Sequence, residues 1–219
     1  MLRTFPEAKG LSLALAICLN QGMDTKNSEF KKLVMRTRSY RRFDQDVKIA
    51  PETIEYLIEL ARNTPSARNA QPLKYLYSCN PKKNSEIFSC LKWAGALPDW
   101  DGPSEGEKPS AYIIMVLDTE ISANPYWDPG IALQTIMLGA SEMGYAGCPI
   151  ANIEGRKLRE IMEIPFKLDI CLVLAIGAPG ENVRLEPFDG KNINYWRDKD
   201  GNHHVPKRSL EEIICGKWV

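Results

Sequence analysis

Two long apolar runs constrain the fold of this chain more than any other feature of its sequence. Residues 111–118, AYIIMVLD, and residues 169–177, DICLVLAIG, are apolar almost throughout instead of alternating between apolar and polar side chains. Such runs are typical of strands that are covered on both faces of a sheet. A third strand is predicted at residues 73–79, LKYLYSC. The sequence therefore predicts a sheet with other elements packed on both of its faces.

Helical patterns lie before, between and after these strands. From Pro51 to Arg62 the apolar residues are spaced as on one face of a helix, and a proline suits the first helical turn. A second helix, apolar nearly all round, is expected from Asp128, a candidate N-cap, to Gly144. A third is expected over about residues 154–163, with a short one after Ser209. Because helices and strands interleave without strict βαβ alternation, we expect a layered α+β domain.

Length and composition fit one globular domain. The 219 residues are 44% hydrophobic and 26% charged, which is enough to bury a sizeable core. The 28 basic residues balance the 28 acidic ones, so no overall charge attracts the chain to nucleic acid or anionic lipid. We expect the domain to span residues 28–219, with residues 1–27 as an N-terminal extension. Residues 98–109, rich in Gly and Pro, are expected to form a surface loop or lid.

Cysteine and histidine usage gives no metal site. The six cysteines are scattered, without the spacing of a zinc ligand set, so we expect free thiols in a reducing compartment. Cys148 is expected to be a small buried hydrophobe without a catalytic part. The only histidines, His203 and His204, lie in a polar run, DKDGNHHVPKR, that predicts a loop with solvated side chains.

The N-terminus leaves more than one interpretation open. Residues 11–19, LSLALAICL, have the length of a signal-peptide core and follow two basic residues, but they are far too short to span a bilayer. A lipoprotein would need Cys18 as its acylated residue, yet Ile17 precedes it where a small residue is required. Met23 could equally be the true start. We expect a cytoplasmic protein, with export as the alternative.

Two further segments are unusually rich in hydrogen-bonding groups. The run MRTRSYRRFDQD carries four arginines within seven residues, at the expected C-terminal end of a helix that begins near Ser28. It could be a solvated helix face, a basic patch for nucleic acid, or a binding site for a small anion. The loop NTPSARNAQP places amides and a hydroxyl between two prolines. These groups could bind a ligand or only satisfy the loop's own backbone.

The order of the motifs favours one of these alternatives. An R-S-x-R segment, an amphipathic helix, a P-S-x-x-N-x-Q-P loop, a buried helix opening D-P-G, and the runs G-Y-A-G-C-P-I and I-P…A-I-G follow one another. Together they closely resemble the FMN-dependent nitroreductase family, from about Arg36 to Glu212. The resemblance implies a three-layer α/β/α sandwich with a central mixed, mainly antiparallel sheet. It also implies a homodimer with FMN at the subunit interface.

The same resemblance assigns candidate roles to residues near position 40. In the family this segment binds FMN. The resemblance implies that Arg38 and Ser39 contact the phosphate and ribityl chain, and that Arg41 lies near the pyrimidine edge of the flavin. A fixed guanidinium there stabilises the negative charge of the reduced ring. Thr37 departs from the family, because many relatives have another arginine at that position.

Other candidate cofactor contacts are spread along the chain. In the family the P-S-x-x-N-x-Q-P loop comes from the partner subunit, whereas a later segment offers backbone N–H groups to flavin N5 and a C-terminal basic pair reaches the phosphate. Arg68, inside the loop, is unusual for the family. The resemblance assigns these roles to Pro65, Ser66, Asn69 and Gln71 in the loop, to Ala151 and Asn152, and to Lys207 and Arg208.

The resemblance also implies the reaction. NADH or NADPH would deliver a hydride to the flavin, which would pass it to an electron-poor acceptor such as a nitroaromatic or quinone. Relatives with this fold perform other reactions, so reductive dehalogenation, flavin-linked dehydrogenation and non-catalytic flavin binding remain alternatives. We expect no catalytic side chain, no metal, no nucleic acid and no membrane span.

Overall fold

The computed structural model describes residues 28–219, so the apolar segment 11–19 lies outside the described part of the chain. The chain forms two units, Met1–Arg36 and Thr37–Val219. The described part of the first unit is helix α2, Glu29–Arg36, which begins directly after Ser28 as predicted. The helix ends at Arg36, so the three arginines that follow lie on extended chain and not on a helix face. No helix within residues 28–219 is both long enough and apolar enough to cross a bilayer.

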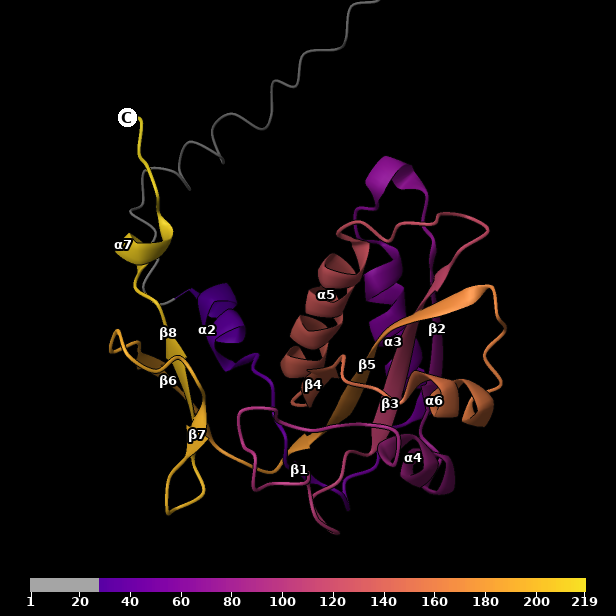
Figure 1. The fold of residues 1–219 in the computed structure, drawn as a ribbon, viewed down its shortest axis with the longest axis horizontal. Helices are drawn as coiled ribbons and strands as arrows, with labels where there is room; N and C mark the ends of the chain where they lie inside the picture. Colours follow the sequence, from indigo (N-terminus) through magenta and orange to yellow (C-terminus); the bar gives the residue numbers. More distant parts are fainter. Residues whose placement is uncertain (1–27) are drawn as a thin grey trace, which may run out of the picture. The chain divides into compact units, whose positions relative to one another are not determined.

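One five-stranded sheet forms the centre of the second unit (Figure 1). Its strands are β1 (Phe43–Asp44), β2 (Leu73–Ser78), β3 (Ala111–Asp118), β4 (Ala146–Ile150) and β5 (Leu168–Pro179). The strand order is β1-β5-β3-β2, and β4 also pairs with β5. These ladders are antiparallel, and one parallel bridge joins Ser39 to Gly147. The predicted mixed, mainly antiparallel sheet is therefore confirmed.

Helices cover both faces of this sheet, as the apolar runs require. They are α3 (Pro51–Arg62) and α5 (Asp128–Glu142) on one face, and α4 (Pro81–Phe88) and α6 (Gly155–Ile161) on the other. Strand β3 is buried along its whole length because its side chains alternate between two clusters. Ile113 and Met115 pack with α3 and α5, whereas Ile114 and Val116 pack with the α4 and α6 side. The predicted α/β/α layering follows directly.

A second, three-stranded sheet occupies the C-terminal part of the chain, and its strand β8 lies in the run DKDGNHHVPKR, where the sequence predicted a loop. It consists of β6 (Val183–Pro187), β7 (Trp196–Arg197) and β8 (His203–Lys207), in the order β6-β8-β7. Strands β6 and β8 are parallel, and β7 and β8 are antiparallel. The short helix predicted after Ser209 is present as α7 (Leu210–Ile213), where Ser209 and Glu212 form a reciprocal capping box.

The predicted helix boundaries agree with the structure apart from a shorter α6 and one cap. Helix α3 matches its predicted bounds, α6 is shorter than expected, and Gly144, with φ of 84°, follows the end of α5. Asp128 does not cap α5, because Trp127 holds the N-cap position and the Asp128 carboxylate contacts another loop. Helix α4 and strand β4 were not predicted.

A close approach of two backbones fixes the start of the sheet. Phe43 in β1 pairs with Pro179 in β5, and the N–H of Gly180 donates to the Arg42 carbonyl at 3.0 Å. A Cβ added at Gly180 would lie 2.6 Å from the Phe43 carbonyl carbon and 2.8 Å from its oxygen. Backbone atoms cannot rotate away as a flexible side chain can. Only glycine at position 180 therefore allows the segment before β1 to lie against the end of β5.

We predict that Gly180→Ala lowers the free energy of unfolding by about 1–3 kcal/mol, the usual cost of forcing atoms into a filled site. Gly155→Ala is the matched control, because a Cβ at Gly155 meets nothing within 4 Å and its φ is not in the left-handed region. Thermal unfolding of both variants gives the comparison. Equal Tm values for the two variants would show that the backbones can separate without cost.

Candidate functional site

The arginine segment, residues 38–42, lies along the edge strand β4. The N–H of Tyr40 donates to the Gly147 carbonyl at 3.0 Å, and Ser39 forms the parallel bridge with the same glycine. Phe43 then starts β1 and pairs with β5. These backbone contacts hold the candidate cofactor residues Arg38, Ser39 and Arg41 against the sheet.

Arg38 and Ser39 have the chemistry of an anion site. The Arg38 side chain is half-buried and donates to the Thr37 carbonyl, and burial lowers the pKa of its guanidinium. A cation removed from water is stabilised when an anion binds beside it. The neighbouring Ser39 hydroxyl makes no hydrogen bond to another residue among 28–219 and is available as a donor. The pair therefore offers the kinds of donor that bind an anion such as a phosphate.

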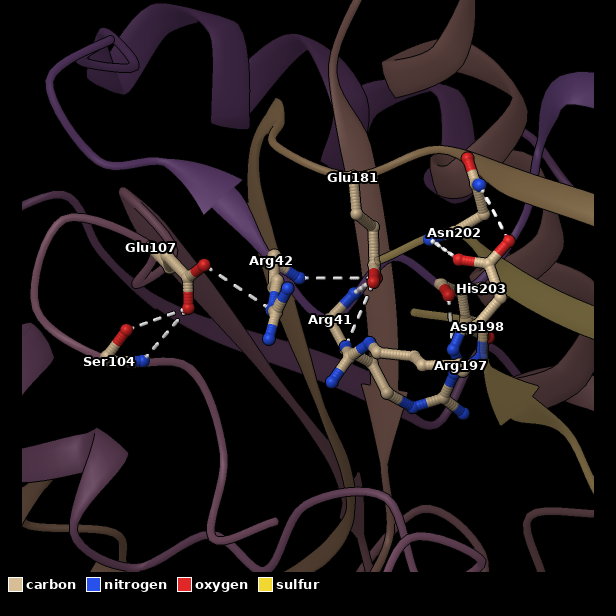
Figure 2. Close-up of polar contacts among 10 residues, drawn as sticks. Arg41, Arg42, Ser104, Glu107, Glu181, Arg197, Asp198, Asn202 and His203 are labelled. Atoms are coloured by element: carbon tan, nitrogen blue, oxygen red, sulfur yellow. Dashed lines mark hydrogen bonds and ion pairs between the residues drawn. The ribbon is translucent and has the colours of Figure 1, made fainter. Parts of the chain in front are cut away.

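Arg41 is held by several contacts (Figure 2). Its backbone N–H donates to a carboxylate oxygen of Glu181, and its Nη1 lies 3.0 Å from His203 Nε2 and 3.4 Å from the Ser39 carbonyl oxygen. The guanidinium also lies 4.2 Å from the centre of the Tyr195 ring. No sequence motif marks Glu181, His203 or Tyr195 as part of this site, because they lie at least 140 residues away along the chain.

The expectation of two solvated histidines was wrong. His203 is 0% exposed because β8 lies between β6 and β7 and directs this side chain inward. Arginine can only donate a hydrogen bond, so His203 Nε2 must accept from Arg41, and the imidazole is neutral with its proton on Nδ1. The pKa of His203 is lowered to about 4, mainly by burial; the charge of Glu181 opposes this shift, and the charges of Arg41 and Arg197 contribute to it.

His204 has the opposite environment. Its Nδ1 lies 2.7 Å from a Glu186 carboxylate oxygen and its Nε2 lies 3.1 Å from one of Asp198. Its ring stacks on Trp196, with ring centres 5.0 Å apart. Hydrogen bonds to Asp198 and Glu186 raise the pKa of His204, because both carboxylates favour the protonated ring.

The loop of residues 65–71 is fixed by the buried carboxylate of Asp128. Ser66 Oγ donates to one carboxylate oxygen at 2.5 Å, and the N–H of Ala67 donates to the other at 3.0 Å. Asp128 is 5% exposed and opens α5, so this helix and the loop are joined. Arg68 and Asn69 adopt φ values of 56° and 55°, a backbone conformation that residues other than glycine adopt at an energetic cost.

Several polar groups of this loop bond within the loop itself. The N–H of Gln71, which also has a positive φ of 52°, donates to Ser66 Oγ at 2.9 Å. Its side-chain amide donates to the Asn69 carbonyl and side-chain oxygens at 3.2 and 3.1 Å. Pro65, Asn69 and Gln71 are exposed. Polar side chains of the loop therefore do satisfy its own backbone, which is the structural role that the sequence left open.

The remaining candidates lie at other ends of strands. Ala151 and Asn152 follow β4 and are exposed, and the Asn152 carbonyl accepts from the N–H of Lys92 at 3.0 Å. Lys207 ends β8 and is exposed. Arg208 follows, pairs with Glu212 at 3.1 Å and lies over the Phe188 ring.

A single chain does not bring all of these residues together. Leu73, directly after the loop, pairs with Leu117, which pairs with Asp169 near the start of β5, whereas Phe43 pairs with Pro179 at the end of β5. Ten residues of strand separate these positions, which corresponds to roughly 33 Å. The arginine segment and the loop therefore lie at opposite ends of the sheet, as Figure 1 shows for β1 and the turn above α3.

Cys148 lies beside the arginine segment but is not activated. Its side chain is 3% exposed, and burial raises its pKa to about 11. The thiol is therefore protonated at neutral pH and is a poor nucleophile. It packs among apolar side chains, as the sequence predicted. The five cysteines within the described residues are free thiols.

We predict that the two imidazoles titrate on opposite sides of the ordinary histidine pKa. Because the chain has two histidines, NMR should show two imidazole signals, one with a midpoint near pH 4 and one above 6.5. His203→Gln removes the first signal and His204→Gln removes the second. Two midpoints near 6.5 would contradict the burial of His203.

The same shifts give opposite pH dependences of stability. The folded-state pKa of His203 is lowered, so its contribution to the free energy of unfolding is lost as the pH falls from 6.5 towards 4. The folded-state pKa of His204 is raised, so its stabilisation is complete below pH 6.5 and is lost as the pH rises through that raised pKa. Denaturant unfolding of each Gln variant across this range measures the two slopes separately.

The chain is similar in sequence to known proteins. A sequence model of the Nitroreductase family matches residues 34–96 and 109–178. A protein of Archaeoglobus fulgidus, provisionally named NADH dehydrogenase/NAD(P)H nitroreductase, is 26% identical over 159 residues, which cover 69% of this chain and 86% of that protein. An iodotyrosine deiodinase of Thermotoga neapolitana is 21% identical, over 74% of this chain and 95% of that protein.

Solved structures share the fold. An FMN-dependent nitroreductase of Clostridium difficile superposes with a TM-score of 0.57 and 22% identity, covering 73% of this chain and 92% of that chain. The family match spans the arginine segment, the loop of residues 65–71 and strands β3 to β5. The chain belongs to the nitroreductase family.

Proposed function

We propose that this protein is an FMN-dependent oxidoreductase that takes a hydride from NADH or NADPH and reduces an electron-poor acceptor such as a nitroaromatic or a quinone. The observation that carries this proposal is the arginine segment, which holds partly buried cations along β4 within the matched part of a nitroreductase chain. Flavin, when bound, supplies the hydride chemistry, and the protein supplies binding, orientation and charge.

The residues near position 40 divide the binding task by their chemistry. Arg38 and Ser39 would hold the phosphate, because a half-buried guanidinium and an available hydroxyl are good phosphate donors. Lys207 and Arg208 would add charge at the end of β8. Arg41 would lie at the pyrimidine edge, where its charge favours electron density on the ring.

The separation along β5 supports a dimer. Arg41 and Asn69 lie at opposite ends of the sheet, so one chain cannot place both on one flavin ring. A second copy can supply its own loop of residues 65–71, already fixed by Asp128. We therefore place FMN between two chains, with Pro65, Ser66, Asn69 and Gln71 from one and the arginine segment from the other.

The described side chains also support chemistry that is carried by a cofactor. His203 and His204 are engaged with arginine or carboxylates, and neither hydrogen-bonds a serine, threonine or cysteine within residues 28–219. The buried Cys148 thiol is protonated. These residues hold charge and shape, and none is arranged as a nucleophile with a base.

Reductive dehalogenation is the second candidate reaction. It is favoured by the similarity to a deiodinase over 95% of that relative's length. Both reactions use the same reduced flavin and differ in the acceptor that replaces the nicotinamide. An acceptor screen therefore distinguishes them on one preparation.

We predict that the purified protein carries FMN and that NADH or NADPH bleaches its visible absorbance within seconds under anaerobic stopped-flow conditions. A nitroaromatic or quinone should restore the colour. If an iodophenol restores the colour and iodide is released, the reaction is reductive dehalogenation and not nitroreduction. If the colour persists with both NADH and NADPH, the protein binds flavin without catalysing the reaction.

We predict that two defective variants complement each other. Arg38→Ala impairs the arginine segment, and Asn69→Asp keeps a residue that tolerates positive φ but adds a charge to the loop. Loss of one charge-assisted contact costs about 1.5–3 kcal/mol, so each variant homodimer should bind FMN at least about tenfold more weakly.

The mixed dimer distinguishes the two arrangements. If each site takes its arginine segment and its loop from different chains, one site of the mixed dimer is native and the other carries both defects. FMN titration of differently tagged, copurified dimers should then show one tight site per two chains. No tight site in the mixed dimer would mean that both segments of a site belong to the same chain.

A further inference from the structure

Two parts of the chain that the family match does not cover meet at the arginine segment. The matched residues skip 97–108 and end at 178, so they omit this loop and the sheet β6-β8-β7. The Arg197 guanidinium in β7 lies 4.1 Å from the centre of the Trp100 ring in the loop. The N–H of Ala96, the last matched residue before the loop, donates to the Tyr195 hydroxyl at 3.3 Å. The loop of residues 97–108 and the sheet β6-β8-β7 therefore pack together beside residues 41 and 42.

A buried carboxylate is the centre of this structure. The Glu181 side chain is 1% exposed, and it accepts from the backbone N–H groups of Arg41 and Arg42 and from Arg197 Nη2 at 2.9 Å. Figure 2 shows the three donors converging on it. A buried carboxylate is retained only when its oxygens are well hydrogen-bonded. Glu181 thereby fixes the backbone from which the Arg41 side chain extends.

The arginines of this region differ in what neutralises them. Arg197 pairs with Glu181, and Arg42 Nε lies 3.3 Å from Glu107 Oε1. Arg41 has no carboxylate within 4.0 Å of its side-chain nitrogens among the described residues. Its guanidinium is held instead by neutral groups, namely His203 Nε2, the Ser39 carbonyl and the Tyr195 ring.

Neutral partners hold the guanidinium of an arginine in one orientation but do not neutralise its positive charge. A carboxylate in the place of His203 would pair with Arg41 and reduce its attraction for a further anion. A lysine or a protonated imidazole would repel it. A neutral imidazole that accepts through Nε2 orients the guanidinium and leaves the positive charge available.

We propose that His203 is a positioning residue that holds the uncompensated charge of Arg41 for the flavin, with the C-terminal sheet as its support. This inference rests on the proposed FMN site and assigns a role to a part of the chain outside the family match. His203 acts through Arg41 and does not itself touch the cofactor.

Three variants at position 203 and its neighbour test the role. In His203→Gln the amide oxygen can replace Nε2 as the acceptor, so FMN affinity and flavin potential should remain close to those of the wild-type protein. His203→Leu removes the acceptor and should weaken FMN binding about tenfold or more and lower the potential. His204→Leu is the control on the same strand, because His204 contacts Asp198 and Glu186 and not Arg41.

A double-mutant cycle separates positioning from general destabilisation. Arg41→Ala alone should weaken FMN binding and lower the flavin potential. If His203 acts through Arg41, His203→Leu should have almost no further effect on either quantity in the Arg41→Ala background. Equal losses in both backgrounds, or a Gln variant as poor as the Leu variant, would overturn the proposal.

A measurement without FMN keeps the inference separate from the proposed function. In the flavin-free protein, 15N NMR should show His203 as the Nδ1–H tautomer, and Arg41→Ala should raise the pKa of His203 because a nearby cation is removed. An unchanged His203 pKa would refute the contact itself. If the NMR experiments give the expected tautomer and pKa change but the wild-type protein does not bind FMN, the proposed function is refuted and the contact between His203 and Arg41 is not.

Discussion

Strand β5 determines the position of every part of the candidate site. Its hydrogen bonds hold β3 on one side and both β1 and β4 on the other, so its twelve residues connect the buried centre of the domain to the arginine segment. Beyond Pro179 the chain continues as Gly180 and Glu181, which contact the backbone of residues 41–43. One strand therefore carries the core and then supplies the carboxylate that anchors the site. A change in the register of β5 would move both together.

A buried carboxylate holds the adjoining chain segment at each end of the sheet. A loop that must keep a defined shape needs its N–H groups satisfied, and in each case a buried carboxylate does this. Asp128 accepts from Ser66 and Ala67 at one end, and Glu181 accepts from Arg41 and Arg42 at the other. Both carboxylates are withdrawn from water, which strengthens their hydrogen bonds and makes the loss of a partner costly.

The layered fold could be predicted from local patterns, whereas much of the site could not. The apolar runs of β3 and β5 and the periodicity of α3 depend on neighbouring residues, which is why their predicted bounds agree with the structure. The burial of His203 depends on strands β6 and β7, which are separated from it along the chain and lie in polar sequence. Asp128 has the residue type of a helix cap, but tertiary contacts with the loop of residues 65–71 determine its role.

The family resemblance identified the arginines but not what distinguishes them from one another. Three of them lie within five residues, and the sequence alone gives each the same charge. The structure distinguishes Arg41 and Arg42 from each other and from the nearby Arg197 by partner: Arg42 has Glu107, Arg197 from β7 has Glu181, and Arg41 has an imidazole, a carbonyl and an aromatic ring. An arginine with a carboxylate contributes little net field at a distance, whereas one held by neutral groups contributes its full charge. His203 of the C-terminal sheet, which lies outside the family match, therefore leaves the charge of Arg41 available to a bound anion, unlike the charges of Arg42 and Arg197.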